Sequence, residues 1–174
     1  MPDAIVIGLG WFLAWLFATA AYHKTRSSVD YFELMRAYVP GLRGGRALVW
    51  LVASVELGVA LLLVMPAWQK AGLLGSVVLL LTYAALIAVQ LARGKTDVRC
   101  GCAGLDSTMT ISKPIVLRNV ICAVLAVLCL SPSGAAPTSF AGVGLSIYVA
   151  LFLIILYLCS DQLASNAQQM AGEV

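Results

Sequence analysis

The sequence is poor in charged residues. Its 174 residues include only 11 Lys or Arg and 8 Asp or Glu, so 11% of the side chains are charged and 61% are apolar. An ordinary soluble domain carries about 25% charged residues, and a water-exposed surface needs them. This composition excludes a disordered chain and argues against a soluble globule. The chain also lacks repeats and a Gly-rich phosphate loop, and we expect no nucleic-acid partner.

Long apolar runs account for most of the chain. Five of them approach the roughly 20 residues that cross a hydrocarbon core: residues 4–22, 47–65, 71–92, 114–130 and 140–159. No basic residue precedes the first run, so we expect an uncleaved helix there rather than a signal peptide. The sequence therefore predicts an all-α polytopic membrane protein, with a bundle of about five transmembrane helices in a single membrane domain, residues 1–174.

The hydrophilic connections carry most of the cations. An odd number of spans places the long segments 23–46 and 93–113 and the polar tail 160–174 on one face. Nine of the eleven cations fall on that face: Lys24, Arg26, Arg36, Arg43, Arg46, Arg93, Lys95, Arg99 and Lys113. The positive-inside rule places this face in the cytoplasm and the N-terminus outside.

The first long connection contains an amphipathic segment, residues 27–39. Ser27-x-x-Asp30 matches a capping box, and Pro40-Gly41 would stop the helix. Aromatic and apolar residues then recur at helical spacing on one face: Tyr31, Leu34, Met35 and Tyr38. We expect a short interfacial helix with its aromatic side towards the bilayer, either as a simple connector or as a functional lid.

Charged and polar residues within the runs are few, and each is a candidate site. Glu56 lies about ten residues into the second run, roughly 15 Å deep at 1.5 Å per residue, where a carboxylate must be protonated or paired. Arg118 enters from the same face and reaches part of the way. Together they predict either a structural ion pair or a functional group, namely a proton relay or a polar anchor for a quinone. Asn119 can bridge helices, and Lys24 at the end of the first run is expected to snorkel to the interface.

The five cysteines divide into two groups. Cys122, Cys129 and Cys159 lie in apolar runs, where a free thiol behaves as a small hydrophobe. Cys100 and Cys102 instead lie in the polar segment 93–113, on either side of Gly101.

The Cys100-Gly101-Cys102 motif favours a dithiol or disulfide pair. Gly101 allows the tight turn, and the small ring departs from relaxed geometry, which makes a disulfide a better oxidant. Arg99 favours the attacking thiolate. A zinc site would need four ligands, and this segment offers no further Cys or His. Metal binding and an incidental pair remain the alternatives.

The motifs in this part of the chain resemble the MauE family of methylamine-utilisation membrane proteins, which is related to the DoxX-like redox-associated group. The resemblance rests on Leu91-x-Arg93-Gly94, Cys100-Gly101-Cys102-x-Gly104, Ile111-Ser112 and Arg118-Asn119, with further similarity at Tyr22-His23-Lys24 and Glu56-Leu57. It covers roughly residues 10–130. Two positions depart from the family pattern: Arg99 stands where Asp is frequent, and Lys113 where Trp is frequent.

The resemblance implies a role in maturing the disulfide-rich small subunit of a periplasmic quinoprotein amine dehydrogenase, in the bacterial cytoplasmic (inner) membrane. It implies a thioredoxin-like partner, MauD. Cys100 and Cys102 would be the redox pair, with Arg118 and Asn119 as motif positions of unassigned role. By analogy with other membrane thiol oxidases, a quinone near Arg118 and Glu56 would regenerate the pair.

Three functional hypotheses follow. The first is a thiol–disulfide exchange protein, the second a non-catalytic scaffold for the partner or client, and the third a small transporter that uses Glu56. The first conflicts with the charge distribution, because exchange with a periplasmic partner requires segment 93–113 on the periplasmic face. Either functional cations invert the topology, or electrons cross the bilayer from a cytoplasmic donor, with the buried thiols as relay points.

Overall fold

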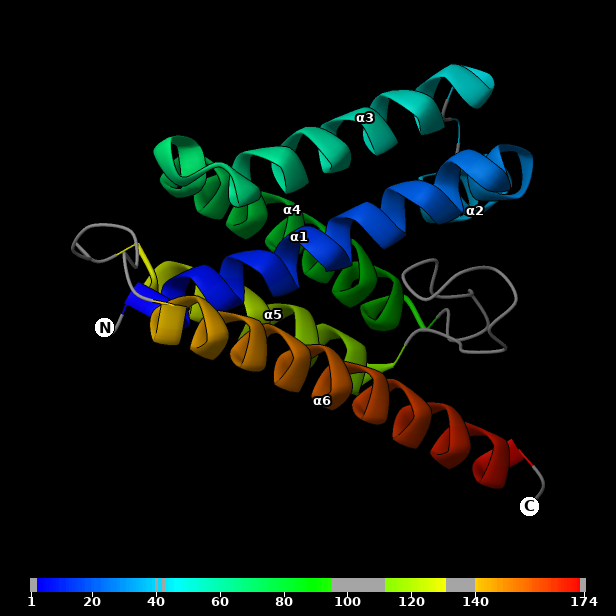
Figure 1. The fold of residues 1–174 in the computed structure, drawn as a ribbon. Coiled ribbons are helices and arrows are strands. Elements are labelled where there is room, and N and C mark those ends of the chain that lie inside the picture. Colours follow the sequence, from blue (N-terminus) through cyan, green and yellow to red (C-terminus); the bar gives the residue numbers. More distant parts are fainter. Residues whose placement is uncertain (1–2, 40, 42, 95–111, 131–139, 173–174) are drawn as a thin grey trace.

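The structure is a computed structural model that describes residues 3–39, 41, 43–94, 112–130 and 140–172. Within these ranges the chain folds into helices (Figure 1). In chain order they are α1 (Asp3–Arg26), α2 (Ser28–Tyr38), α3 (Gly45–Val64), the short 3₁₀ helix η1 (Pro66–Trp68), α4 (Gln69–Ala92), α5 (Lys113–Leu128) and α6 (Phe140–Gly172). The expected all-α polytopic membrane fold is confirmed.

The long helices run back and forth along one bundle. Figure 1 places α2, the end of α4 and the start of α5 at one end of the bundle, which we call the α2 end. The N-terminus lies at the opposite end and the C-terminus at the α2 end, as an odd number of passages requires. Segment 93–113 therefore leaves and re-enters the bundle at the α2 end.

The five passages differ in length. Four helical segments of the described chain are long and apolar enough to cross a membrane: Asp3–Arg26, Gly45–Val64, Pro66–Ala92 and Phe140–Ala167. The fourth predicted span, 114–130, forms α5, which has only 16 residues and is about 24 Å long at 1.5 Å per residue. In its last turn the amide of Cys129 still bonds to the carbonyl of Leu125, and the amide of Leu130 then bonds to the carbonyl of Val127, three residues back, in a tighter turn.

Small residues determine where the helices contact one another. A Cβ on Gly72 would lie 2.7 Å from the backbone nitrogen of Leu63, so α4 rests directly on α3 beside η1. Gly8 allows the same close contact between α1 and the backbone of Ser146 on α6. Close backbone approach at small residues is a common basis of helix association in membranes.

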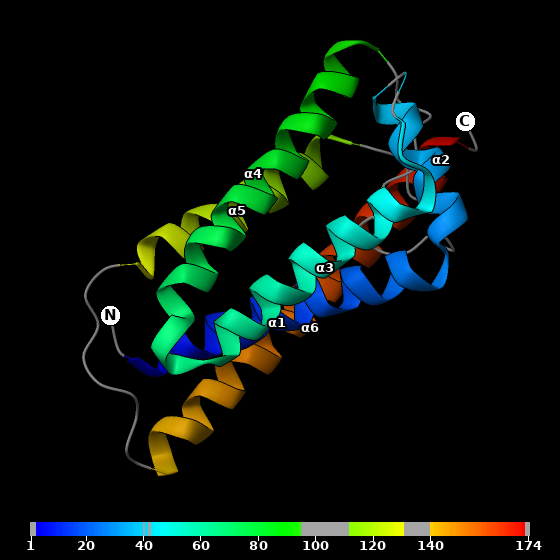
Figure 2. The same cartoon turned by 90° about the horizontal axis from the view of Figure 1, so that it is seen from above.

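The bundle opens from these contacts into a V. In Figure 2, α3 and α4 meet near η1 and diverge towards the α2 end, α3 running with α1 and α4 with α5. Helix α6 packs along α1. The widest part of the V lies beside α2.

Within the predicted polar tail 160–174, residues 160–172 are a continuation of α6. This helix runs without interruption from Phe140 to Gly172, well past the predicted end of the last span at residue 159. Its polar half projects beyond the apolar part of the bundle at the α2 end (Figure 1).

The interfacial helix predicted for residues 27–39 exists as α2, but its capping box does not form. Ser27 has φ −120° and ψ 47° and makes no side-chain capping hydrogen bond, whereas a capping residue normally has extended backbone. The reason is that α1 continues to Arg26, which leaves Ser27 as the only joint between two helices.

Candidate functional site

A buried charged cluster lies between α1, α3 and α4. The Nζ of Lys24 donates a hydrogen bond to Oε1 of Glu56 at 2.7 Å, and the two side chains are 9% and 0% exposed. The hydroxyl of Tyr83 donates to the same oxygen at 2.5 Å. The Lys24 ammonium also lies 5.4 Å from the ring centre of Tyr83 and 5.8 Å from that of Tyr31, distances at which cation–π attraction contributes.

This cluster corrects two predictions made from the sequence. Glu56 does not pair with Arg118, and Lys24 does not extend to the interface. Because α1 continues through Lys24 to Arg26 alongside α3, the lysine lies inside the bundle and within reach of the carboxylate. The structural ion pair predicted at Glu56 therefore exists with a different partner.

A cavity of about 330 Å³ surrounds the cluster. We call it the Glu56 cavity. Its walls come mainly from α1, α2 and α4, and single positions of α5 (Asn119) and α6 (Tyr157) complete it together with Glu56 and Val52 of α3. All four residues of the predicted amphipathic face of α2, namely Tyr31, Leu34, Met35 and Tyr38, also line it. The apolar face of α2 is therefore directed into the bundle, as a lid would be.

A hydrogen bond across the V holds α2 in this place. The Nε2 of Gln90, on α4, donates to the backbone carbonyl of Tyr38 at 2.6 Å. At the other end of α2, Nε of Arg46 donates to the hydroxyl of Ser28 at 3.0 Å. Helix α2 is thus tied to α4 at its last residue and to α3 at its first.

Two buried polar atoms of the Glu56 cavity have no hydrogen-bond partner among the described residues. One is Oε2 of Glu56, since both of the donors described above converge on Oε1. The other is Nδ2 of Asn119, whose residue is 6% exposed. Unsatisfied buried polar atoms are rare in folded proteins, so the cavity offers one acceptor and one donor to a ligand.

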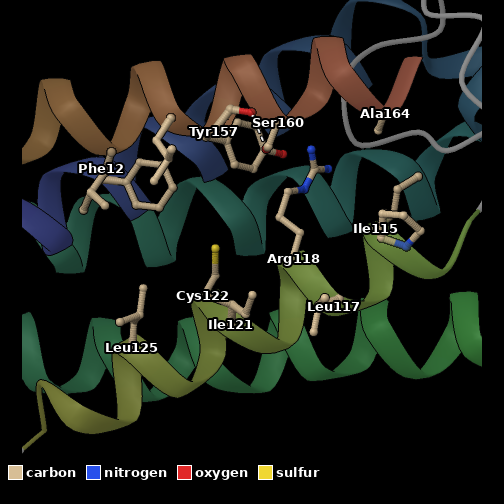
Figure 3. A pocket seen from close by; sticks show the side chains of 13 residues that line it. Phe12, Ile115, Leu117, Arg118, Ile121, Cys122, Leu125, Tyr157, Ser160 and Ala164 are labelled. Carbon is tan, nitrogen blue, oxygen red and sulfur yellow. Dashed lines mark hydrogen bonds between the residues drawn. The ribbon is translucent and has the colours of Figure 1, made fainter. Parts of the chain in front are cut away.

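Arg118 lines a different cavity, of about 310 Å³, between α5 and α6. Figure 3 shows its side chain reaching from α5 towards Tyr157 and Ser160 on α6. Its guanidinium lies 4.2 Å from the ring centre of Tyr157 and forms an ion pair with Asp161 at 2.5 Å. We call this the Arg118 cavity. The sequence-based expectation of one quinone site near both Arg118 and Glu56 is thereby corrected: the two residues line separate cavities.

The cysteines of the apolar runs are unpaired. Cys122 and Cys129 are buried, as expected for packing residues, and Cys122 also lines the Arg118 cavity (Figure 3). Cys159 is exposed on the surface of α6. No group of three His, Cys, Asp or Glu side chains within the described ranges could hold a metal ion.

The proposed redox pair, Cys100 and Cys102, lies outside the described residues, as do Arg99 and Gly101. Their segment is bounded by residues that the structure does describe. Arg93 follows the last turn of α4, and Gly94, at φ +72°, ends the helix in the left-handed conformation typical of glycine. Both residues lie at the α2 end.

The sequence profile described as "Methylamine utilisation protein MauE" matches residues 2–132. The chain belongs to the MauE family. The matched region contains α1 to α5 and with them Lys24, Glu56 and Asn119, whereas Tyr157 and Asp161 on α6 lie beyond it.

Similar curated proteins carry the same description. "Methylamine utilization protein MauE" of Paracoccus denitrificans is 28% identical over 166 residues, covering 93% of this chain and 89% of the relative. The protein of that name from Paracoccus versutus is 31% identical over 156 residues, covering 87% and 83%. No solved structure matches this MauE-family chain.

Tyr83, Gln90 and Asp161 were not predicted from the sequence. Tyr83 and Gln90 lie in an apolar run, where a few hydroxyl and amide groups are the only sign that the helix has a polar face. Asp161 lies in the tail, from which nothing was inferred, yet it follows Tyr157 by four residues and so shares its helix face. That spacing is the signal that could have identified it.

Proposed function

We propose that this chain is a membrane thiol–disulfide exchange protein that supports methylamine utilisation in the bacterial cytoplasmic membrane. Membership of the MauE family supports the link to methylamine utilisation. The observation that supports the exchange chemistry is where the cysteine segment joins the bundle. Cys100-Gly101-Cys102 lies between the end of α4 and the start of α5, and both of these helix ends lie at the α2 end, which also holds the lysine of the Glu56 cavity.

The exchange runs in two steps. A thiolate of the partner attacks the Cys100–Cys102 disulfide, forms a mixed disulfide and displaces the other cysteine as a thiolate. The second partner thiolate then attacks the mixed disulfide and releases the reduced pair. Two electrons and two protons pass from the partner to Cys100 and Cys102, and the partner becomes oxidised.

The reduced pair must be reoxidised before another cycle. We propose a membrane quinone as the oxidant, which takes up the two electrons and two protons and leaves as the quinol. The proposed partner is a thioredoxin-like protein of the MauD type, and the proposed client is the small subunit of a periplasmic amine dehydrogenase. The cycle supplies the oxidising equivalents for the many disulfides of that small subunit.

Trapping of the mixed disulfide tests the proposal. With the second cysteine of the partner changed to Ser, the mixed disulfide cannot be resolved, and the partner should remain attached to this chain through a bond that reducing agent breaks, seen as a shifted band on a non-reducing gel. The double variant Cys100→Ser, Cys102→Ser should give no adduct and an unassembled client. The matched control changes Cys122, Cys129 and Cys159 to Ser and should keep both adduct and assembly. Normal client assembly in the double variant would refute the proposal.

The membrane face of the segment is tested separately. A membrane-impermeant maleimide is applied to intact cells, in the variant that keeps only Cys100 and Cys102. Labelling after reduction of the cells indicates a periplasmic pair that exchanges directly with a periplasmic partner. Labelling only after the cells are opened indicates the cytoplasmic face that the cation distribution favours, and then overturns direct periplasmic exchange.

A non-catalytic scaffold is the second candidate, and the charged pairs favour it. Lys24–Glu56 joins α1 to α3 and Arg118–Asp161 joins α5 to α6, so both fix the relative positions of helices. A scaffold predicts that the partner co-purifies with the double cysteine variant as well as with the unaltered chain.

A further inference from the structure

The Glu56 cavity is accessible from the apolar surface of the bundle. Among the residues that line it, Thr82 and Leu86 of α4 are exposed and Val52 of α3 is half-buried. They belong to α3 and α4, the two helices that diverge in Figure 2. An apolar molecule dissolved in the bilayer can therefore enter between the two helices without crossing water.

The charges inside the cavity favour a neutral ligand. The carboxylate of Glu56 is already balanced by the ammonium of Lys24 at 2.7 Å, and among the described residues no further Asp, Glu, Lys or Arg lines the cavity. A charged ligand would therefore be buried without a counter-ion, which is strongly unfavourable. What the cavity offers instead is Oε2 of Glu56 as an acceptor and Nδ2 of Asn119 as a donor, both without a partner in the described chain.

The remaining walls suit a flat ring with an apolar tail. Aromatic side chains on four helices contribute to the lining: Phe17, Tyr31, Tyr38, Tyr83 and Tyr157. Aromatic rings pack well against other rings. Aliphatic residues such as Leu79, Leu80 and Ile87 supply the rest.

We infer that the Glu56 cavity is the binding site for the head group of a membrane quinone and its quinol. The amide of Asn119 would donate to a quinone carbonyl, and Oε2 of Glu56 would accept from a quinol hydroxyl. This inference rests on the proposed function for the need of an oxidant, but the site is argued from the cavity alone. It assigns Asn119 a ligand-binding role and leaves Arg118, its neighbour in sequence, outside the site.

Binding of decylubiquinone to the purified full-length chain in lipid nanodiscs tests the site, with quenching of tryptophan fluorescence as the readout. Two matched substitutions distinguish the cavities, because Ala20 lines the Glu56 cavity and Ala164 lines the Arg118 cavity. Ala20→Leu should fill part of the site and weaken binding by about tenfold or more, while Ala164→Leu should leave it unchanged. The reverse result would place the quinone in the Arg118 cavity and overturn the inference.

Recognition of the head group is tested on the unaltered chain with decylbenzene, which keeps a ring and the tail but has no oxygen. It should compete poorly with decylubiquinone. Asn119→Leu should weaken decylubiquinone by about tenfold, the usual worth of one hydrogen bond at a binding site, and leave decylbenzene unaffected. Equal binding of the two compounds would mean that the cavity holds only acyl chains, and would overturn the inference.

The double variant Cys100→Ser, Cys102→Ser separates this inference from the proposed function. It should bind decylubiquinone as the unaltered chain does. If quinone binds but no mixed disulfide is ever trapped, the exchange function fails and the site stands. If adducts form but quinone does not bind, the site fails and the exchange function stands with a different oxidant.

Discussion

The two charged pairs of this bundle differ in how completely they are enclosed. Lys24–Glu56 lies between α1 and α3 with side chains 9% and 0% exposed, and a tyrosine hydroxyl binds the same carboxylate oxygen. Arg118–Asp161 joins α5 to α6 with side chains 13% and 16% exposed, and one face of the guanidinium rests on Tyr157. A buried charge that loses its partner is costly, whereas a charge with access to solvent can be rehydrated. The comparison therefore predicts that the first pair dominates stability.

Removal of the lysine should have the largest effect. Lys24→Met leaves the carboxylate of Glu56 without its counter-charge in an apolar interior, which should cost about 3 kcal/mol of unfolding free energy. Thermal unfolding of the purified protein in detergent measures it. The double variant Lys24→Met, Glu56→Leu should recover most of the loss, because it removes both charges. A double variant as unstable as the single one would show that packing of the lysine chain matters more than charge.

Removal of the tyrosine hydroxyl should have a smaller effect. Tyr83→Phe keeps the ring beside Lys24 and removes the hydroxyl that donates to Glu56, so about 1.5 kcal/mol should be lost. The same unfolding assay measures this difference. Its control is Tyr148→Phe, because Tyr148 is 67% exposed on α6 and should be neutral. Equal losses in the two variants would contradict a special role for Tyr83.

The more exposed of the two pairs, Arg118–Asp161, should be the less sensitive and the more dependent on salt. Asp161→Asn should cost about 1 kcal/mol or less, because the guanidinium keeps Tyr157 and some access to solvent. High salt should shrink that difference, since it screens accessible charges. The loss from Lys24→Met should hardly change with salt. Equal salt dependence in both variants would mean that the two pairs are equally exposed to ions.

The sequence predicted the position of a residue along its helix better than contacts between helices. Hydropathy located the helices, and the position of Glu56 in its run placed it correctly inside the bundle, because depth follows from counting residues along one helix. The partner of Glu56 was wrong, because it is determined by how far α1 and α3 slide past each other. Neither apolar run contains a sequence signal for that offset, so Lys24 was predicted to be an interfacial residue.

The direction in which side chains point around a helix could not be predicted from the sequence either. Arg118 and Asn119 are adjacent in sequence and line different cavities, because successive residues of an α-helix point about 100° apart. Both were singled out as polar residues in an apolar run. Only the packing of α5 against α4 on one side, with the Arg118 cavity on the other, gives them separate surroundings.

The amphipathic helix illustrates the same limit. The spacing of Tyr31, Leu34, Met35 and Tyr38 correctly predicted that they share one face of α2. The expectation that this face would meet the bilayer was wrong, because the same spacing suits contact with lipid and with protein, and both environments are apolar. The structure directs it into the Glu56 cavity, tied down by Gln90.

The sequence by itself therefore determined the membrane class, the helical fold and the family, because length, hydropathy and short motifs are local properties of the chain. The tertiary structure alone decided which charges pair, that Glu56 and Arg118 line two cavities, and that one of these holds a donor and an acceptor without a partner in the part of the chain that the structure describes. These features depend on small residues such as Gly72 that let α3 and α4 touch at one end of the bundle. They also depend on the divergence of these helices at the other end, which local sequence does not encode.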